Sequence, residues 1–331
     1  MAKKWTAEAV LEMAREYQRA CVLTAAADLD LYTGIGGAAL GAGEAAAKLN
    51  ADARGVRVLL DALAALGLLV KKAGKYRAAP GLSKLLSEGP GSVLAMTQHQ
   101  ANCMRRWDQL AAVVKQGKPA EKRASIRGAD ADYASFIEAM NNLSGPVAGK
   151  LVKQIKPPQF SHLLDVGGGS GTWTIAFLKR NAKARGTIFD LPKVKEQARR
   201  RIASAGLSDR VEFVAGDFYQ DELPPGANLA WVSAIVHQSP REQNRMLFAK
   251  AARALAGGGH VLIRDILMEE SRTAPVSGAL FAVNMLVGTE GGGTYTFDEL
   301  REDLESAGFV EAKVLRRDPG MNSVVQARKA G

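Results

Sequence analysis

A glycine-rich turn, Asp165-Val-Gly-Gly-Gly-Ser-Gly171, follows a short apolar run and precedes a run with helical spacing. Glycine lets the backbone turn tightly at such a place and lets a ligand approach the main chain closely. Dinucleotide sites use the spacing Gly-x-Gly-x-x-Gly, whereas here the alternate glycines fall at 167, 169 and 171 and a threonine occupies position 172. The loop therefore marks Gly167 and Gly169 as part of a cofactor site without identifying the ligand.

Acidic residues at the ends of neighbouring strand-like runs narrow the choice of cofactor. Asp190 lies 19 residues after Gly171 and can accept both hydroxyls of a ribose. Asp217 ends the following run and can accept an adenine amino group, while Phe218 packs against the ring. Asp165 opens the loop, where its carboxylate would attract a sulfonium and an ammonium group and repel a pyrophosphate. Together these residues favour S-adenosylmethionine over a dinucleotide.

A histidine follows the next strand-like run, residues 229–236, and is a candidate catalytic base. Ligands of open α/β sheets bind beyond the carboxyl ends of the strands, so we expect His237 to face the cofactor crevice. Imidazole titrates near neutral pH and can remove the proton of a phenol or another hydroxyl. The alternative is a histidine that only caps a strand end.

The C-terminal half alternates strand-like with helical runs, which indicates βαβ units and a parallel sheet. We predict a Rossmann-like α/β domain with a mostly parallel seven-stranded sheet that ends in an antiparallel hairpin. The expected strands are 162–166, 187–189, 211–214, 229–236, 260–264, 312–315 and 323–327. The expected helices are 172–181, 194–205 and 241–255.

The N-terminal part reads as three helical segments followed by a small hairpin, which is the order of a winged helix. The helical segments are residues 6–32, 43–49 and 53–66, and the hairpin is 68–77 with its turn at Ala73-Gly74. Further helices are expected at 93–114 and 133–155. We therefore predict a winged-helix dimerisation domain at 1–90, a helical linker that contributes to the active site at 91–156, and a cofactor-binding domain at 157–331.

The third helical segment, 53–66, indicates whether the winged helix binds DNA or another protein surface. Apart from Arg54, Arg57 and Asp61 it is apolar on nearly every face, whereas a helix that reads DNA needs polar side chains toward the bases. We expect it to be buried in a core or a subunit interface. The leucines at 59, 60, 63 and 66 exceed what a small helical module can bury, which predicts a homodimer through this domain.

The motifs DVGGGSG, DLP, GDF, a strand ending in histidine, GGGHVLIRD and a late AGF occur in this order along the chain. In this order they resemble the plant caffeate and acetylserotonin O-methyltransferase family, including its bacterial small-molecule members. The resemblance spans nearly the whole chain, because the winged helix is similar to that family's dimerisation domain. It implies S-adenosylmethionine as cofactor, a small-molecule acceptor, and contacts to the cofactor from Gly167, Asp190, Leu191, Asp217, Phe218, Ser233 and, in the linking helix, Ser144.

The same resemblance implies that Asp265, at the end of the strand after His237, orients the base. We expect a largely apolar acceptor pocket lined by Trp107, Met140, Asn141, Phe281, Asn284 and Met285. A lone methionine or aromatic residue at helical spacing more often belongs to a core. Asn141 and Asn284 are more informative, because polar groups beside an apolar pocket usually contact a ligand.

Two departures from the family pattern affect the predicted chemistry. Gln238-Ser239 replaces the usual Asp-Trp after the histidine, and Thr294 stands where a second base-orienting glutamate is expected. These changes leave the cofactor residues intact but keep the acceptor atom open. Methyl transfer to carbon, or another use of the sulfonium on the same fold, therefore remains an alternative to O-methylation.

Composition limits the other classes of function. The 331 residues carry a formal net charge of +10 that is spread over both halves. The densest basic cluster, between Arg105 and Arg127, is typical of a solvated helix face, with a surface for an anionic substrate or RNA as the alternative. The competing functions are an RNA methyltransferase, indicated only by this diffuse charge, and a DNA-binding winged-helix regulator. Cys21 and Cys103 form no CxxC motif, so neither a disulfide framework nor a metal site is expected. No apolar run reaches bilayer length and no secretory signal is visible, which predicts a cytoplasmic protein.

Overall fold

The computed structural model describes residues 4–331 and divides into two compact units. One unit contains the chain up to residue 105 together with 122–143, and the other contains 106–121 together with 144–331. The segment expected to be a linker is therefore shared between the units, each of which is described by itself below. Within the described residues, no helix combines the length and the apolar character needed to span a bilayer.

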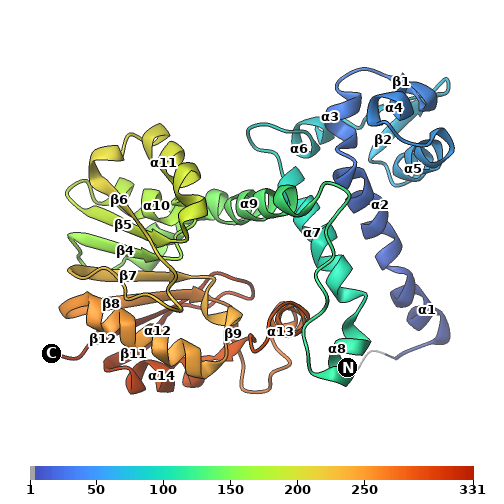
Figure 1. The fold of residues 1–331 in the computed structure, drawn as a ribbon. Helices are drawn as coiled ribbons and strands as arrows, with labels where there is room; N and C mark the ends of the chain where they lie inside the picture. Colours follow the sequence, from blue (N-terminus) through green and yellow to red (C-terminus); the bar gives the residue numbers. More distant parts are fainter. Residues whose placement is uncertain (1–3) are drawn as a thin grey trace. The chain divides into compact units, whose positions relative to one another are not determined.

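The second unit is built on a seven-stranded sheet, as predicted (Figure 1). The strands lie in the order β11-β12-β8-β7-β4-β5-β6, and only the β11–β12 and β12–β8 pairs are antiparallel. Their bounds are β4 His162–Val166, β5 Arg185–Asp190, β6 Val211–Ala215, β7 Ala227–Ser233, β8 Leu255–Asp265, β11 Phe309–Arg316 and β12 Ser323–Lys329. The central strands are apolar on both faces because helices cover both sides.

Two hydrophobic layers enclose this sheet. Trp173, Phe177 and Trp231 centre the layer beneath the C-terminal part of α9 (Ala129–Ile155), α10 (Thr172–Arg180) and α11 (Lys195–Ser204). The other layer lies beneath α12 (Arg241–Ala254) and α14 (Phe297–Ser306). Along each strand alternate side chains enter opposite layers, so neighbouring residues at a strand end face different surroundings.

The strand order reverses direction at β4 and β7. From β4 the chain builds β5 and β6 on one side, and it then returns to place β7 and β8 on the other. In open parallel sheets, the crevice for a ligand opens at the carboxyl ends of the strands where this reversal occurs. The glycine-rich loop follows β4 and the histidine follows β7, so both lie at this switch point.

The first unit contains the three predicted helical segments and the hairpin. They form α1 (Ala7–Arg15), α2 (Tyr17–Asp28), α3 (Leu31–Ile35), α4 (Ala42–Leu49), α5 (Ala53–Ala65) and the strands β2 (Leu69–Lys72) and β3 (Lys75–Ala78). A two-residue strand, β1 (Leu40–Gly41), completes a sheet in the order β1-β3-β2. Helix α6 (Leu82–Leu86) and most of α7 (Leu94–Trp107) also belong to this unit, whereas α8 (Leu110–Gln116) belongs to the second unit.

The expectation that α5 is buried on nearly every face is wrong. Leu60 and Leu63 are fully buried within the unit's own core, whereas Arg54, Arg57 and Val58 are exposed. The helix is amphipathic, because α2, α4 and the hairpin cover only one side of it. Its leucines therefore provide no argument for a dimer, and its exposed arginines weaken the argument against DNA binding.

Several predicted element boundaries also differ from the structure. The helical segment expected at 6–32 is divided into α1, α2 and α3. Strand β7 ends at Ser233 and not at Val236, because Ala234 adopts a left-handed conformation with φ of 58° that turns the chain out of the sheet. The helix expected at 93–114 is interrupted between α7 and α8, at Asp108 and Gln109. Periodicity could not reveal either of the last two breaks, since the apolar spacing continues through both.

We expect the buried carboxylate of Asp303 to stabilise the packing of α14 on α12. It is fully buried and accepts hydrogen bonds from Arg241 Nη2 at 2.8 Å and Arg245 Nε at 2.7 Å. Asp303→Ala should lower the free energy of unfolding by about 2–3 kcal/mol, because hydrogen bonds to a charged group are lost. Urea unfolding followed by tryptophan fluorescence measures this. Glu302→Ala is the control, since its exposed carboxylate also contacts Arg241 and should contribute less than about 1 kcal/mol.

Candidate active site

A buried histidine–aspartate pair lies where β7 and β8 end. His237 occupies a short 3₁₀ turn, Val236–Gln238, and lies four residues beyond Ser233, the last residue of β7. The sequence pattern predicts instead that it follows the strand directly. Its Nδ1 lies 2.9 Å from both Oδ1 and Oδ2 of Asp265, the last residue of β8. The backbone amide of Ile266 donates to Asp265 Oδ1 at 2.8 Å and fixes the carboxylate. The structure thus brings together the two residues predicted to be catalytic.

This pairing determines which nitrogen of the imidazole carries its proton. A carboxylate only accepts hydrogen bonds, so Nδ1 donates to Asp265 and the neutral ring keeps its lone pair on Nε2. Among residues 4–331 no group hydrogen-bonds to Nε2. The Phe281 ring lies 4.8 Å from the imidazole at an interplanar angle of 90° and restricts its rotation. The geometry suits a base that removes a proton through Nε2.

Polar contacts hold the 3₁₀ turn in place, and the sequence reasoning did not identify them. Asn244 Nδ2 donates to the Val236 carbonyl at 2.9 Å, and Gly293 N donates to the His237 carbonyl at 2.9 Å. The Ser239 hydroxyl lies 2.7 Å from Tyr219 Oη. These partners come from segments that are far apart in the sequence. Only Asn244, a polar residue on the apolar face of α12, could have been identified from the sequence as a contact of this kind.

The structure places both departures from the family pattern beside His237. Gln238 folds back and donates to the Ala234 carbonyl at 2.9 Å, so its amide stabilises the turn. Thr294 is buried in the loop that contacts the histidine backbone through Gly293. Within the described chain, Asp265 is the one carboxylate that contacts the His237 imidazole.

The predicted cofactor residues gather at the carboxyl ends of β4, β5 and β6. Asp190 accepts hydrogen bonds from Gly169 N and Leu191 N, both at 2.7 Å, and burial raises the pKa of its carboxyl group. Gly167 has φ of 64°, and a Cβ there would lie 2.6 Å from Ile235 Cδ1 and 3.4 Å from Phe218 Cε1. The loop therefore needs glycine at position 167, where the positive φ and the nearby Ile235 side chain exclude a Cβ.

Asp217 lies at the outer end of this row. Its Oδ1 accepts from Tyr219 N at 2.9 Å and its Oδ2 accepts from Gln220 Nε2 at 3.2 Å, which fixes the carboxylate at the end of β6. Phe218 packs against Tyr219 with the ring centroids 4.5 Å apart. Leu191 is partly exposed beside Asp190. These residues can hold an adenosine group, with the ribose at Asp190 and the adenine between Asp217 and Phe218.

Asp165 does not behave as the sequence suggested. Its carboxylate is buried and accepts hydrogen bonds from Thr174 Oγ1 at 2.6 Å and Thr174 N at 3.1 Å, which joins the loop to α10. Burial raises the pKa of Asp165 to about 7, so the group is only partly ionised at neutral pH. Its predicted repulsion of a pyrophosphate is correspondingly weaker.

The residues predicted from the resemblance alone lie in different environments. Ser233 ends β7, and its hydroxyl accepts a hydrogen bond from Arg264 Nη1 at 3.1 Å. Ser144 is half-buried in α9, two residues before a proline within that helix. Both belong to the second unit, together with the loop and the histidine.

The structure brings together part of the predicted acceptor pocket. Trp107 Nε1 donates to Asn284 Oδ1 at 2.9 Å, and Phe281 and Met285 lie on the same helix, α13 (Val276–Gly288). Met285 is buried and Phe281 meets His237. Met140 and Asn141 belong to the first unit, where Asn141 Nδ2 lies 3.0 Å from Glu138 Oε1.

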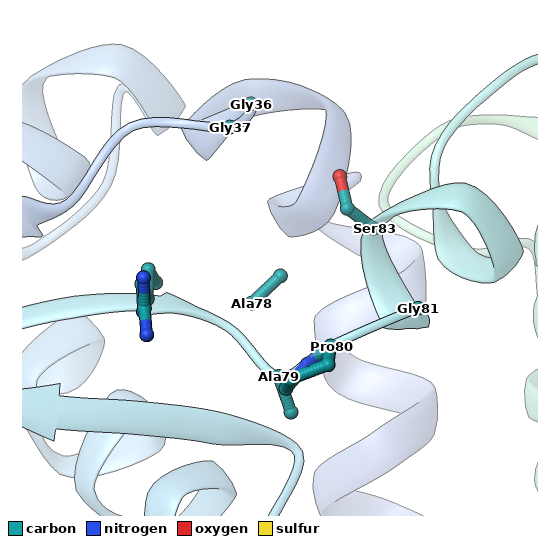
Figure 2. Close-up of a pocket in the computed structure, with 8 residues that line it drawn as sticks. Gly36, Gly37, Ala78, Ala79, Pro80, Gly81 and Ser83 are labelled. Carbon is teal, nitrogen blue, oxygen red and sulfur yellow. The ribbon is translucent and has the colours of Figure 1, made fainter.

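A separate hollow of about 260 Å³ lies in the first unit (Figure 2). Figure 2 shows it bordered by the backbone of Gly36 and Gly37 on one side and by Ala78, Pro80 and Ser83 on the other. Arg77 is its one charged lining residue. It contains none of the predicted site residues, and across residues 4–331 no cluster of three or more His, Cys, Asp or Glu side chains is arranged to hold a metal ion.

Gly292 must lack a side chain for His237 to keep its position. A Cβ at Gly292 would lie 2.4 Å from the His237 carbonyl oxygen, whereas a Cβ at Gly293 would have no atom within 4 Å. Gly292→Ala should therefore lower turnover in the predicted methyl transfer by roughly 10- to 100-fold, since the base is displaced. Gly293→Ala is the matched control and should retain activity. Steady-state kinetics decide, and equal activity in the two variants would contradict this account.

Comparison with known proteins extends these observations. Residues 107–310 match the O-methyltransferase domain family, and residues 11–88 match the O-methyltransferase dimerisation domain. The 3-hydroxy-5-methyl-1-naphthoate 3-O-methyltransferase of Streptomyces sahachiroi is 33% identical over 93% of this chain and 91% of its own. The acetylserotonin O-methyltransferase of Gallus gallus is 32% identical over 86% of each chain.

Solved structures agree with this assignment. The structure of the mitomycin 7-O-methyltransferase MmcR has a TM-score of 0.83 and 26% identity, covering 98% of this chain and 97% of that one. The match to the winged-helix module assigns it to a dimerisation domain, in agreement with the resemblance inferred from the sequence. The chain belongs to the O-methyltransferase family and transfers methyl groups from S-adenosylmethionine to hydroxyl groups of small molecules.

Proposed function

We propose that His237 is the general base of this methyltransferase and that it deprotonates an aromatic hydroxyl through Nε2. The observation that carries the proposal is the contact of Nδ1 with both oxygens of Asp265, at 2.9 Å each, while Nε2 has no partner within the described chain. A phenolate is a far better nucleophile than a phenol, and positioned proton transfer typically contributes about 10²–10⁴-fold in rate.

The surrounding residues support this base in distinct ways. Asp265 holds the imidazole in the tautomer that leaves Nε2 unprotonated, and it stabilises the imidazolium formed when the proton is taken. Phe281 prevents the ring from swinging away. S-adenosylmethionine supplies an electrophilic methyl group on its sulfonium. Asp190, Asp217 and Phe218 would hold its adenosine portion at the ends of β5 and β6.

The acceptor that fits these side chains is an aromatic compound with a hydroxyl and a second polar group. Phe281 and Met285 provide apolar contact area on α13. Trp107 Nε1 donates a hydrogen bond to the Asn284 oxygen, which leaves the amide nitrogen of Asn284 to donate a hydrogen bond to the methyl-accepting substrate. The hydroxynaphthoate named for the Streptomyces relative has this chemical character. Met140 and Asn141 remain proposed contacts from α9.

The N-terminal unit supports a homodimer through a surface different from the one predicted. No residue of α1 is buried, although Val10, Leu11 and Met13 are apolar and more than half exposed. Tyr17 continues this exposed surface at the start of α2. Exposed apolar side chains at helical spacing mark a contact surface for another helix. Since the module belongs to a dimerisation family, we propose a second copy of the chain as the occupant.

His237→Ala should reduce turnover by roughly 10²–10⁴-fold and leave the affinity for S-adenosylhomocysteine nearly unchanged, since the imidazole acts on the acceptor proton. Asp265→Asn should cause a smaller loss, because the base remains but is poorly oriented. Turnover measured with methyl acceptors of different phenol pKa tests the role of His237 as a base, since methylation of acceptors that are already ionised should depend less on His237. Full activity of His237→Ala on a neutral hydroxyl would exclude a base at this position and favour transfer to carbon.

The proposed dimer surface can be tested by introducing charge. Val10→Glu combined with Met13→Glu should shift the protein from dimer to monomer in light scattering at micromolar concentration, because two like charges cannot be buried unpaired in an apolar contact. Val58→Lys is the matched control, since Val58 is an equally exposed apolar residue on α5. Dissociation by the Val58 variant alone would place the contact on α5 instead.

A further inference from the structure

Arg264 is a buried cation that the catalytic pair does not use. It precedes Asp265 at the carboxyl end of β8, and only 3% of its surface is exposed. Three hydrogen bonds reach its guanidinium group. Nη1 donates to Ser233 Oγ at 3.1 Å, while Nε and Nη2 donate to Asn322 Oδ1 at 3.0 and 2.7 Å. All of these acceptors are neutral.

The remaining contact is also with a neutral group. The guanidinium carbon lies 4.7 Å from the centroid of the Trp173 ring, over which it forms a cation–π contact. Three hydrogen bonds leave two of the five N–H groups of Arg264 without an acceptor in the described chain. A buried arginine is usually paired with a carboxylate, because removing its charge from water costs several kcal/mol.

The nearest carboxylates are already engaged with other cations or donors. Asp265 contacts His237, and Asp318 pairs with Arg316 Nη2 at 2.7 Å. Burial lowers the pKa of Arg264 to about 10, so the side chain still carries its positive charge at neutral pH. Asp265 and Asp318 act on Arg264 through their charge, but within the described chain no carboxylate accepts a hydrogen bond from its guanidinium group.

The register of the sheet places Arg264 level with the start of the cofactor loop. Ser233 pairs with Arg264, and Val232 pairs with Val166, the last residue of β4. Ser233 and Arg264 thus lie level with the first glycine of the loop. Trp173 stands in the first turn of α10, directly after the loop. The guanidinium group is on the α10 side of the sheet, opposite the side on which Asp265 meets His237.

We infer that Arg264 and the hydroxyl of Ser233 anchor the carboxylate of the methionine portion of S-adenosylmethionine. This rests on S-adenosylmethionine being the methyl donor. That carboxylate is the one negative charge of the molecule, since the adenosine is neutral and the sulfonium is positive. Because Arg264 donates to Ser233 Oγ, the hydroxyl hydrogen of Ser233 is left to point outward and donate. Arg264 thus supplies charge and also positions Ser233.

Two ligands that differ in the amino-acid portion separate this role from general folding. S-adenosylhomocysteine contains the carboxylate, whereas 5′-methylthioadenosine lacks the whole amino-acid end. By calorimetry, Arg264→Met should bind S-adenosylhomocysteine about 10- to 100-fold more weakly, the loss expected for charged hydrogen bonds. Binding of 5′-methylthioadenosine should stay within about twofold of wild type. Arg328→Met is the control, since it also removes one positive charge, from a partly exposed residue on β12 that pairs with Glu311.

Three results would overturn the inference or its basis. Equal weakening of both ligands in Arg264→Met would show a structural role for Arg264, and unchanged binding of S-adenosylhomocysteine would exclude the anchor. Failure of the wild type to bind either ligand would instead contradict the cofactor assignment. If Arg264→Met does not fold, Ser233→Ala decides, because it should weaken S-adenosylhomocysteine by about 10-fold without affecting 5′-methylthioadenosine. An unchanged ratio of the two affinities in Ser233→Ala would refute the proposal.

Discussion

Strands β7 and β8 pair in parallel with Ser233 opposite Arg264, and the polar chemistry of the second unit depends on this register. Because side chains alternate along a strand, Arg264 and Asp265 face opposite sides of the sheet. Asp265 therefore meets His237 on one side, while Arg264 meets Ser233 and Trp173 on the other. A shift of one residue would exchange the two groups and leave both the proposed base and the proposed anchor without partners.

The cores on each side of the sheet hold this register. Trp231 is fully buried in β7 and packs against Trp173 and Phe177 of α10 with ring centroids 5.1 and 5.0 Å apart. Complete burial of a large apolar side chain contributes roughly 1.5–3 kcal/mol. The same aromatic cluster supports the guanidinium of Arg264. The helix that follows the cofactor loop is thus coupled to the strand that precedes the catalytic turn.

The turn that contains His237 is held by hydrogen bonds to its backbone carbonyl groups. Ala234 leaves the strand in a left-handed conformation that costs an alanine about 1–2 kcal/mol. Contacts from Asn244, Gly293 and Gln238 compensate for it and fix the position of His237. With Thr294 in place of a second carboxylate, Asp265 is the one carboxylate in the described chain that contacts the imidazole. Turnover should therefore depend strongly on the position of this turn, because the described chain has no second carboxylate that could hold a displaced imidazole.

The sequence by itself determined the order of helices and strands, the cofactor loop, and the acidic residues at three strand ends. Glycine spacing and apolar periodicity are local properties, so Gly167, Asp190 and Asp217 could be identified without coordinates. Tertiary structure alone decided which faces are covered and which polar groups find partners. It buried Leu60 and Leu63 of α5 inside the module, weakened the charge of Asp165 beneath the loop, and left α1 exposed. It also revealed the role proposed for Arg264, because the partners of this arginine come from a neighbouring strand, a loop and α10, and cannot be identified from the strand sequence.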